Sequence, residues 1–141
     1  MKREDRLIFL ISKVFQRLMI SLKRSLVQEG LDITPIQVML LFFLKKNNGC
    51  SLTALSRGVM IENSTVTGLV DRLEKAGCVE RRKNPSDRRG YLIHLTEKGD
   101  RLAIQALPLV KGVNEEIKAG YTDEEVEAFK KVLIGAFDKF K

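Results

Sequence analysis

The side chains best suited to chemistry in this 141-residue chain are polar and basic groups in two neighbouring segments. The first segment, residues 64–76, has the periodicity of an amphipathic helix with an apolar inner face. Its outer face carries Ser64, Thr65, Thr67, Gly68, Arg72 and Lys75. The short side chains let the helix N-terminus approach phosphates and base edges, where the helix dipole favours an anion. Arg72 and Lys75 can reach a guanine edge or the backbone of DNA.

The second segment is a basic turn, Asn84-Pro85-Ser86-Asp87-Arg88-Arg89-Gly90. Its turn-forming residues predict an exposed loop between two antiparallel strands, residues 78–83 and 91–95. Such a loop would present Arg88 and Arg89 to a narrow minor groove, whose negative potential favours arginine. Asp87 is expected to pair with Arg88 or Arg89 and to orient its guanidinium before binding. Together the two segments predict a winged helix-turn-helix that binds double-stranded DNA.

Five further helices are expected to position these segments, at about residues 5–28, 34–46, 52–57, 96–119 and 122–140. Thr34 with Gln37, and Thr122 with Glu125, form capping boxes that mark two of the helix starts. Asn63 is the expected N-cap of the polar helix, and Pro108 is expected to kink or break the helix at residues 96–119. The fold class is therefore mostly α, with a small antiparallel β-hairpin.

The two ends of the chain carry more apolar surface than one small domain covers. Residues 1–33 are expected to be an N-terminal dimerisation helix, and residues 100–141 to be C-terminal dimerisation helices. Residues 34–99 are expected to be the DNA-binding domain. The alternative for the long first helix is ordinary core contact within one chain.

Charge is unevenly distributed along the chain, which has a net charge of +7. Residues 81–89 contain five cations and one anion, whereas residues 115–127 contain six anions and one cation. Only the middle of the chain therefore suits a polyanion. No apolar run approaches the ~20 residues of a membrane span, so no membrane partner and a cytoplasmic location are expected.

An enzyme is not expected, because one histidine allows no Ser/His/Asp set and no Gly-rich phosphate loop occurs. That histidine, His94, lies in a predicted strand and is expected to be structural. No cluster of metal ligands is evident, so neither a metal nor a cofactor is expected. Cys50 and Cys78 are too few for a disulfide scaffold and are expected to be small half-buried hydrophobic residues.

The sequence resembles the MarR (multiple antibiotic resistance regulator) family of transcription factors. The resemblance is carried by Thr34-Pro35-x-Gln37, Ser64 to Glu74, Gly77-x-Val79-x-Arg81, Asn84-Pro85-x-Asp87-Arg88-Arg89 and Leu95-Thr96-Glu97-Lys98-Gly99. It implies a homodimer with a wing on each subunit, most often a repressor of a pseudo-palindromic operator. It also implies regulation, often by a small aromatic or phenolic effector, an oxidant or a metal.

Two alternatives remain open at this point. The chain could be a thiol-responsive regulator that uses Cys50 or Cys78, although relatives of that kind carry the reactive cysteine in the first helix. It could also be a winged-helix adaptor whose wing faces another protein. A salt-dependent shift of a DNA duplex would separate a regulator from an adaptor.

Overall fold

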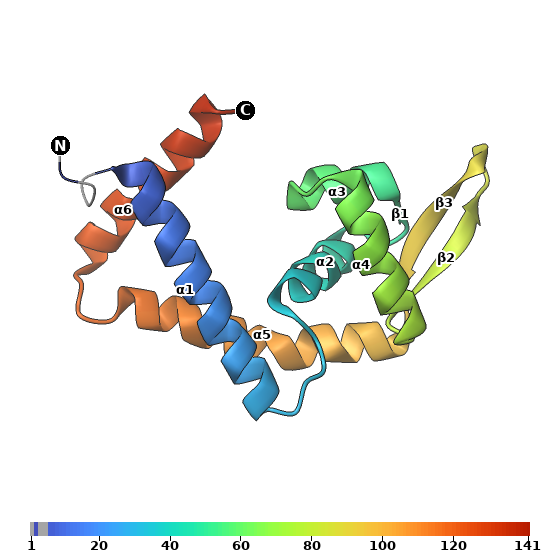
Figure 1. Ribbon diagram of the computed structural model, residues 1–141, viewed down its shortest axis with the longest axis horizontal. Helices are drawn as coiled ribbons and strands as arrows, with labels where there is room; N and C mark the ends of the chain where they lie inside the picture. The colour runs from blue at the N-terminus through green and yellow to red at the C-terminus, as the bar shows by residue number, and fades with distance from the viewer. Residues whose placement is uncertain (1, 3–5) are drawn as a thin grey trace.

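The computed structural model describes residue 2 and residues 6–141. The chain forms six helices and three short strands over the described residues, arranged as shown in Figure 1. In order these are α1 (Leu7–Gln28), α2 (Pro35–Lys46), β1 (Cys50–Ser51), α3 (Leu52–Val59), α4 (Asn63–Lys75), β2 (Val79–Asn84), β3 (Asp87–Leu95), α5 (Glu97–Lys118) and α6 (Asp123–Lys139). The predicted fold class is confirmed. The predicted start of the first helix at Asp5 lies outside the described residues.

The strands form one antiparallel sheet in the order β1-β3-β2. Ile93 in β3 is opposite Cys50 on one side and Arg81 on the other. Figure 1 shows the β2–β3 hairpin projecting from one end of the molecule, beside α4. Helices α1 and α6 lie at the opposite end, and α5 runs between the two ends.

The core lies mainly under α4 and α2. The predicted inner face of α4 is buried, because Val66, Leu69, Val70 and Leu73 are each at most 8% exposed. Leu40, Leu41 and Leu44 of α2 are fully buried as well. Burial of this apolar stripe holds α4 against the body of the molecule and leaves its polar face outward.

Local capping signals in the sequence are confirmed for two helices. Thr34 accepts a hydrogen bond from the Gln37 amide, and the Gln37 side chain accepts one from the Thr34 amide. Thr122 and Glu125 form the same reciprocal pair at the start of α6. Each pair satisfies two amides that a helix N-terminus leaves without partners.

Two local predictions are wrong, and a third is wrong in part. Asn63 is the first residue of α4, not its N-cap; Glu62 occupies that position and makes no side-chain cap. The loop predicted at residues 84–90 is shorter, because β2 and β3 continue until only Pro85 and Ser86 separate them. A kink or a break was expected at Pro108; the break is absent, because α5 continues through that residue. Helix α5 packs against α1 and α2, and this packing offsets the loss of the one backbone hydrogen bond that proline removes.

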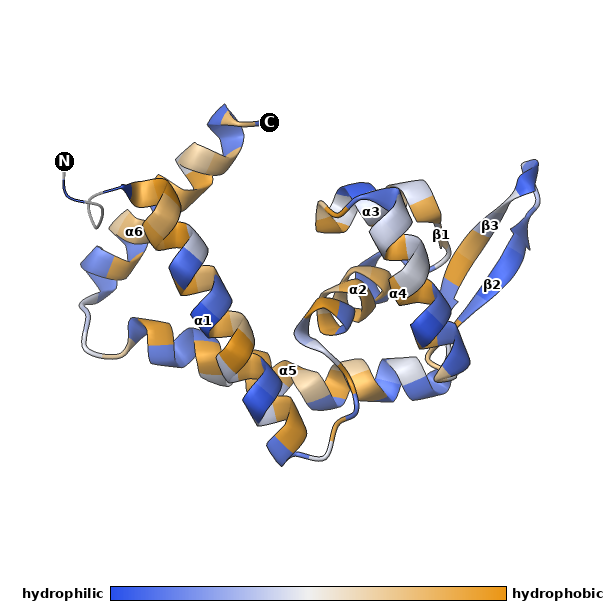
Figure 2. Cartoon of the chain, viewed as in Figure 1, coloured by the Kyte–Doolittle hydropathy of each residue, from blue (hydrophilic) through white to orange (hydrophobic). Residues whose placement is uncertain are grey.

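Helices α1 and α6 leave wide apolar faces exposed, and Figure 2 shows hydrophobic residues recurring along both. Helix α6 contains no buried residue at all. Its exposed large side chains are Phe129, Val132, Leu133, Ile134 and Phe137. On α1 they include Leu7, Ile8, Phe9, Leu10, Ile11, Val14 and Phe15. Apolar faces this large mark a surface that another molecule covers.

None of the helices in the described part of the chain is both long enough and apolar enough to cross a membrane.

Candidate nucleic-acid interface

The outer face of α4 is directed to solvent. Ser64, Thr65, Gly68, Arg72 and Lys75 are exposed on it. Thr67 is half-buried, and its hydroxyl donates a hydrogen bond of 2.8 Å to the Asn63 carbonyl oxygen. The Thr67 hydroxyl hydrogen is therefore already used inside the helix, whereas the other polar groups of this face can bind an external partner.

The start of α5 holds the C-terminal end of α4. The Lys98 ammonium donates to the Ala76 carbonyl at 2.5 Å, and the Thr96 hydroxyl donates to the Gly77 carbonyl at 2.6 Å. Both carbonyls follow the last turn of α4, where backbone acceptors lack helical partners. Gly77 turns the chain with φ +76°, a conformation that favours glycine. These contacts couple the orientation of α4 to that of α5.

The wing is a hairpin with its two arginines in the strand rather than in a loop. Arg88 and Arg89 are exposed in β3, close to the tip. The Asp87 carboxylate accepts a hydrogen bond of 2.9 Å from the Arg89 backbone amide. No ion pair joins Asp87 to Arg88 or Arg89, all three of which are described. The predicted guanidinium-orienting role of Asp87 is therefore replaced by a turn contact, in which the carboxylate fixes backbone.

Arg81 joins the wing to α4, and the sequence analysis missed this role. Its guanidinium contacts Asp71 at 2.6 Å and Glu74 at 2.9 Å, and its backbone amide donates to Glu74 at 3.2 Å. Partial burial by itself would lower the pKa of Arg81, but the hydrogen bonds and charges of the two carboxylates outweigh it and raise the pKa. The available signal was the pair of acids three residues apart in α4, followed by an arginine at the start of a strand. This contact fixes the angle between the helix and the hairpin.

Residues 34–99, called the lobe from here on, contain both paired and unpaired cations. Arg81 pairs with acids of α4, and Arg82 pairs with Glu80 on its own strand. Among the described residues, no ion pair involves Arg72, Lys75, Arg88 or Arg89. Arg72, Lys75, Arg88 and Arg89 therefore give the outer face of α4 and the wing a positive surface suited to phosphates.

The two thiols have little reactive character. Cys78 is buried and Cys50 half-buried, and both are free. Burial raises the pKa of Cys50 and also that of Cys78, for which the nearby Lys98 charge only partly offsets the effect. A raised pKa leaves less thiolate at neutral pH, and thiolate is the form that oxidants attack. These environments disfavour the thiol-responsive alternative.

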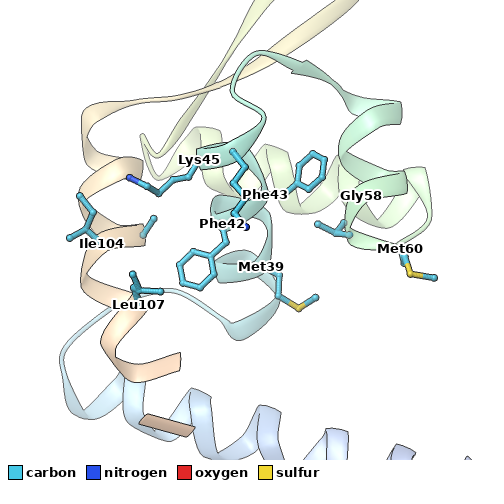
Figure 3. A pocket seen from close by; sticks show the side chains of 11 residues that line it. Met39, Phe42, Phe43, Lys45, Gly58, Met60, Ile104 and Leu107 are labelled. Carbon is cyan, nitrogen blue, oxygen red and sulfur yellow. The ribbon is translucent and has the colours of Figure 1, made fainter. Parts of the chain in front are cut away.

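Two open apolar pockets adjoin each other on the side of the lobe that faces α1 and α5. The larger, of about 770 Å³, is lined by α2, the end of α3 and α5. Figure 3 shows Met39, Phe42 and Leu107 around it, with Lys45 near its edge. The second, of about 530 Å³, adds Phe15, Met19 and Lys23 of α1 and shares Met39, Val59 and Met60 with the first.

Metal-binding chemistry has no support in the described residues, since no three His, Cys, Asp or Glu side chains gather there. His94 of β3 packs beside Gly49 in the turn before β1: a Cβ on Gly49 would lie 2.7 Å from the His94 ring. This packing is in keeping with the structural role expected of His94.

Comparison with known proteins shows that the chain is similar to MarR-family regulators over more than the short sequence motifs. The model of the MarR family matches residues 33–91. The uncharacterized HTH-type transcriptional regulator YsmB of Bacillus subtilis is 34% identical over 102 residues, 72% of this chain and 70% of that protein. The B. subtilis repressor YetL is 32% identical over 110 residues, 78% of this chain and 66% of that protein. A MarR mutant from Escherichia coli, solved with operator DNA, is 29% identical with a TM-score of 0.86 over 94% of both chains. The structural similarity thus includes the helices outside the lobe.

Proposed function

Because this chain belongs to the MarR family of DNA-binding transcriptional regulators, we propose that it acts as a homodimeric repressor of a pseudo-palindromic operator. It is a regulator and not an enzyme. In the proposal, residues 34–99 bind DNA, and residues 1–33 and 100–141 dimerise. Helix α4 enters the major groove with Ser64, Thr65, Thr67, Gly68, Arg72 and Lys75. The wing reaches the minor groove with Arg88 and Arg89, and Asp87 holds the backbone beside them.

The observation that carries the proposal is the position of the unpaired cations. Arg72 and Lys75 on α4, and Arg88 and Arg89 on the wing, have no carboxylate partner among the described residues. Arg81 meanwhile fixes the helix and the hairpin relative to each other. A polyanion with a major groove beside a minor groove fits this arrangement. The MarR mutant solved with operator DNA supports the same partner.

Alanine substitutions on helix α4 and on the wing should affect DNA binding in different ways. Arg72→Ala should weaken operator binding by roughly 1–3 kcal/mol and relax the base preference at one position per half-site. Arg89→Ala should weaken binding evenly across sequences and reduce the salt slope by about one charge per subunit. Affinity selection of duplexes from a random library, followed by titrations at several salt concentrations, measures both. Half-sites about 10 bp apart, or a multiple of that, are expected.

Arg82→Ala is the matched control, because Arg82 is already paired with Glu80 on its own strand. It should change the salt slope much less than Arg89→Ala does. A wild-type protein that enriches no duplex, or one that binds with no salt dependence, would instead favour the adaptor alternative.

Relief of repression by a small aromatic or phenolic effector is the second part of the proposal. The adjoining pockets have a combination of apolar walls and a few charged groups that suits such a molecule. Lys45 at the edge of the larger pocket is paired with Asp100 at the start of α5, the segment that also holds the end of α4. An acidic or phenolic ligand that draws Lys45 away would therefore act on the element that orients α4.

A panel of single-ring aromatic carboxylates and phenols should include a compound that raises the Tm and releases the selected duplex. Leu107→Trp should abolish both effects while leaving DNA binding intact, because Leu107 lines the pocket and is 41% exposed. Thermal shift and duplex release, measured together, test this. If an active compound works equally well on Leu107→Trp, its site lies elsewhere.

A further inference from the structure

Gly68 lies in the middle of the outward face of α4, one turn after Ser64 and one turn before Arg72. It is exposed, and its backbone is helical without a positive φ. A Cβ added at this position would meet no other atom within 4 Å. Nothing inside this chain therefore requires glycine at position 68.

Gly99 and Gly58 have internal reasons, whereas Gly112 of α5 and Gly135 of α6 resemble Gly68, because a Cβ at either would also meet no other atom within 4 Å. A Cβ at Gly99 would lie 2.0 Å from the Cys78 carbonyl oxygen, and one at Gly58 would lie 1.9 Å from the Phe43 ring. Glycine in the interior of a helix destabilises it relative to alanine, because glycine loses more conformational freedom on folding. At Gly68 this destabilisation has no internal compensation. What distinguishes Gly68 from Gly112 and Gly135 is its place on the outward face of α4, so a side chain at position 68 would meet the partner of that face, which is DNA if the proposed function holds.

The backbone groups at Gly68 limit the kinds of chemical group that can bind there favourably. Inside a helix, the Gly68 amide donates to the carbonyl of Ser64, and the Gly68 carbonyl accepts from the amide of Arg72. The position therefore presents Cα hydrogens and open space, with no free donor for a phosphate or for a base acceptor. An apolar group gains most from such a site. The one apolar group on the base edges of the major groove is the C5-methyl of thymine.

We propose that Gly68 is a specificity-determining residue, which forms a socket for the C5-methyl of one thymine in each operator half-site. Ser64 and Arg72, one turn away on either side, offer polar groups to the neighbouring base edges. The Thr67 hydroxyl donates to the Asn63 carbonyl and does not compete for this base. The thymine is recognised by its shape, because any side chain at position 68 would occupy the space of its methyl group.

The test uses the full-length protein and the duplex that the wild type selects from a random library. Each thymine of the half-site is replaced in turn by deoxyuridine, symmetrically in both half-sites, which removes only the methyl group. At one position, the replacement of thymine by deoxyuridine should weaken wild-type binding by about fourfold per half-site. This is the amount expected for one buried methyl group. Deoxyuridine at thymines outside the half-sites is the matched control and should have no effect.

Gly68→Ala is the reciprocal change on the protein. It should raise the Tm by about 3 °C, because alanine favours the helix. It should weaken binding to the thymine duplex at least tenfold. The preference should also invert, so that this variant binds the deoxyuridine duplex more tightly than the thymine duplex.

Three results would overturn the socket while leaving the proposed function intact. In the first, no deoxyuridine substitution changes the affinity of the wild type. In the second, the Gly68→Ala variant binds the thymine duplex as tightly as the wild type does. In the third, the Gly68→Ala variant loses the same affinity for the thymine duplex and the deoxyuridine duplex. If Gly68→Ala does not fold, the wild-type deoxyuridine series decides alone. A wild type that selects no duplex overturns the proposed function, and the socket with it.

Discussion

A Phe137→Asp variant should sediment as a monomer at micromolar concentration and lose at least about 100-fold in operator affinity, because two linked half-site contacts become one. Phe137 is 53% exposed on α6, a helix with no buried residue of its own. If a second copy of this chain covers that face, two-fold symmetry places the new charge in the interface twice. Little intrachain packing is lost, so the helical circular dichroism should persist.

Met60→Asp provides the matched control for this change. Met60 is 71% exposed, so it also exchanges an exposed apolar side chain for a charge, but at the end of α3. Its φ of 56° suits aspartate, which tolerates the left-handed region better than most residues. This variant should remain dimeric and should bind the operator normally. A dimeric Phe137→Asp protein with full affinity would show that α6 does not supply the interface.

A Gly99→Ala variant should lose about 3 kcal/mol of stability and about 10 °C in Tm, through overpacking and weakened hydrogen bonds. Gly99 is buried in the first turn of α5, and a Cβ there would lie 2.0 Å from the Cys78 carbonyl oxygen. The clash is with backbone, so no side-chain rotation relieves it. The same carbonyl accepts from the Thr96 amide at 3.1 Å, and separating the two segments would lengthen that bond.

Gly112→Ala in the same helix is the control, since its Cβ would meet nothing within 4 Å. It should leave the Tm unchanged or raise it slightly, because alanine favours a helix. Thermal unfolding of the three proteins at one concentration measures the difference. Equal Tm values for Gly99→Ala and Gly112→Ala would mean that α5 and the start of β2 are not packed as described.

Several predictions made from the sequence depended on interactions within four residues, and these were confirmed. The buried face of α4 follows from apolar residues at helical spacing, and the capping boxes at Thr34 and Thr122 follow from their local partners. Asn63 shows the limit of this reasoning. A residue type suited to capping does not fix the helix start, because the chain enters α4 from the turn at Met60, and Glu62 becomes the N-cap.

The wing was predicted as a basic hairpin but with the wrong internal geometry. Proline, asparagine and glycine between residues 84 and 90 favour a loop, yet pairing between β2 and β3 continues to Asn84 opposite Asp87. The Asp87 carboxylate then lies against the Arg89 amide instead of a guanidinium. Hydrogen bonding between the two strands competes with the local preference for a turn. The length of the loop therefore depends on both strands together, not on the turn residues alone.

The fold class and the polar face of α4 can be predicted from the amino-acid sequence, because periodicity, capping and charge act locally along the chain. Its motifs determined the family resemblance. The contacts between segments are seen only in the folded chain: Arg81 with Asp71 and Glu74, Lys98 with the Ala76 carbonyl, and Gly99 against Cys78. These contacts join residues 7 to 22 positions apart in the sequence. Residues this far apart in the sequence come into contact only when the hairpin and α5 fold back on α4. The spacing of residues along the chain does not specify how those segments fold back.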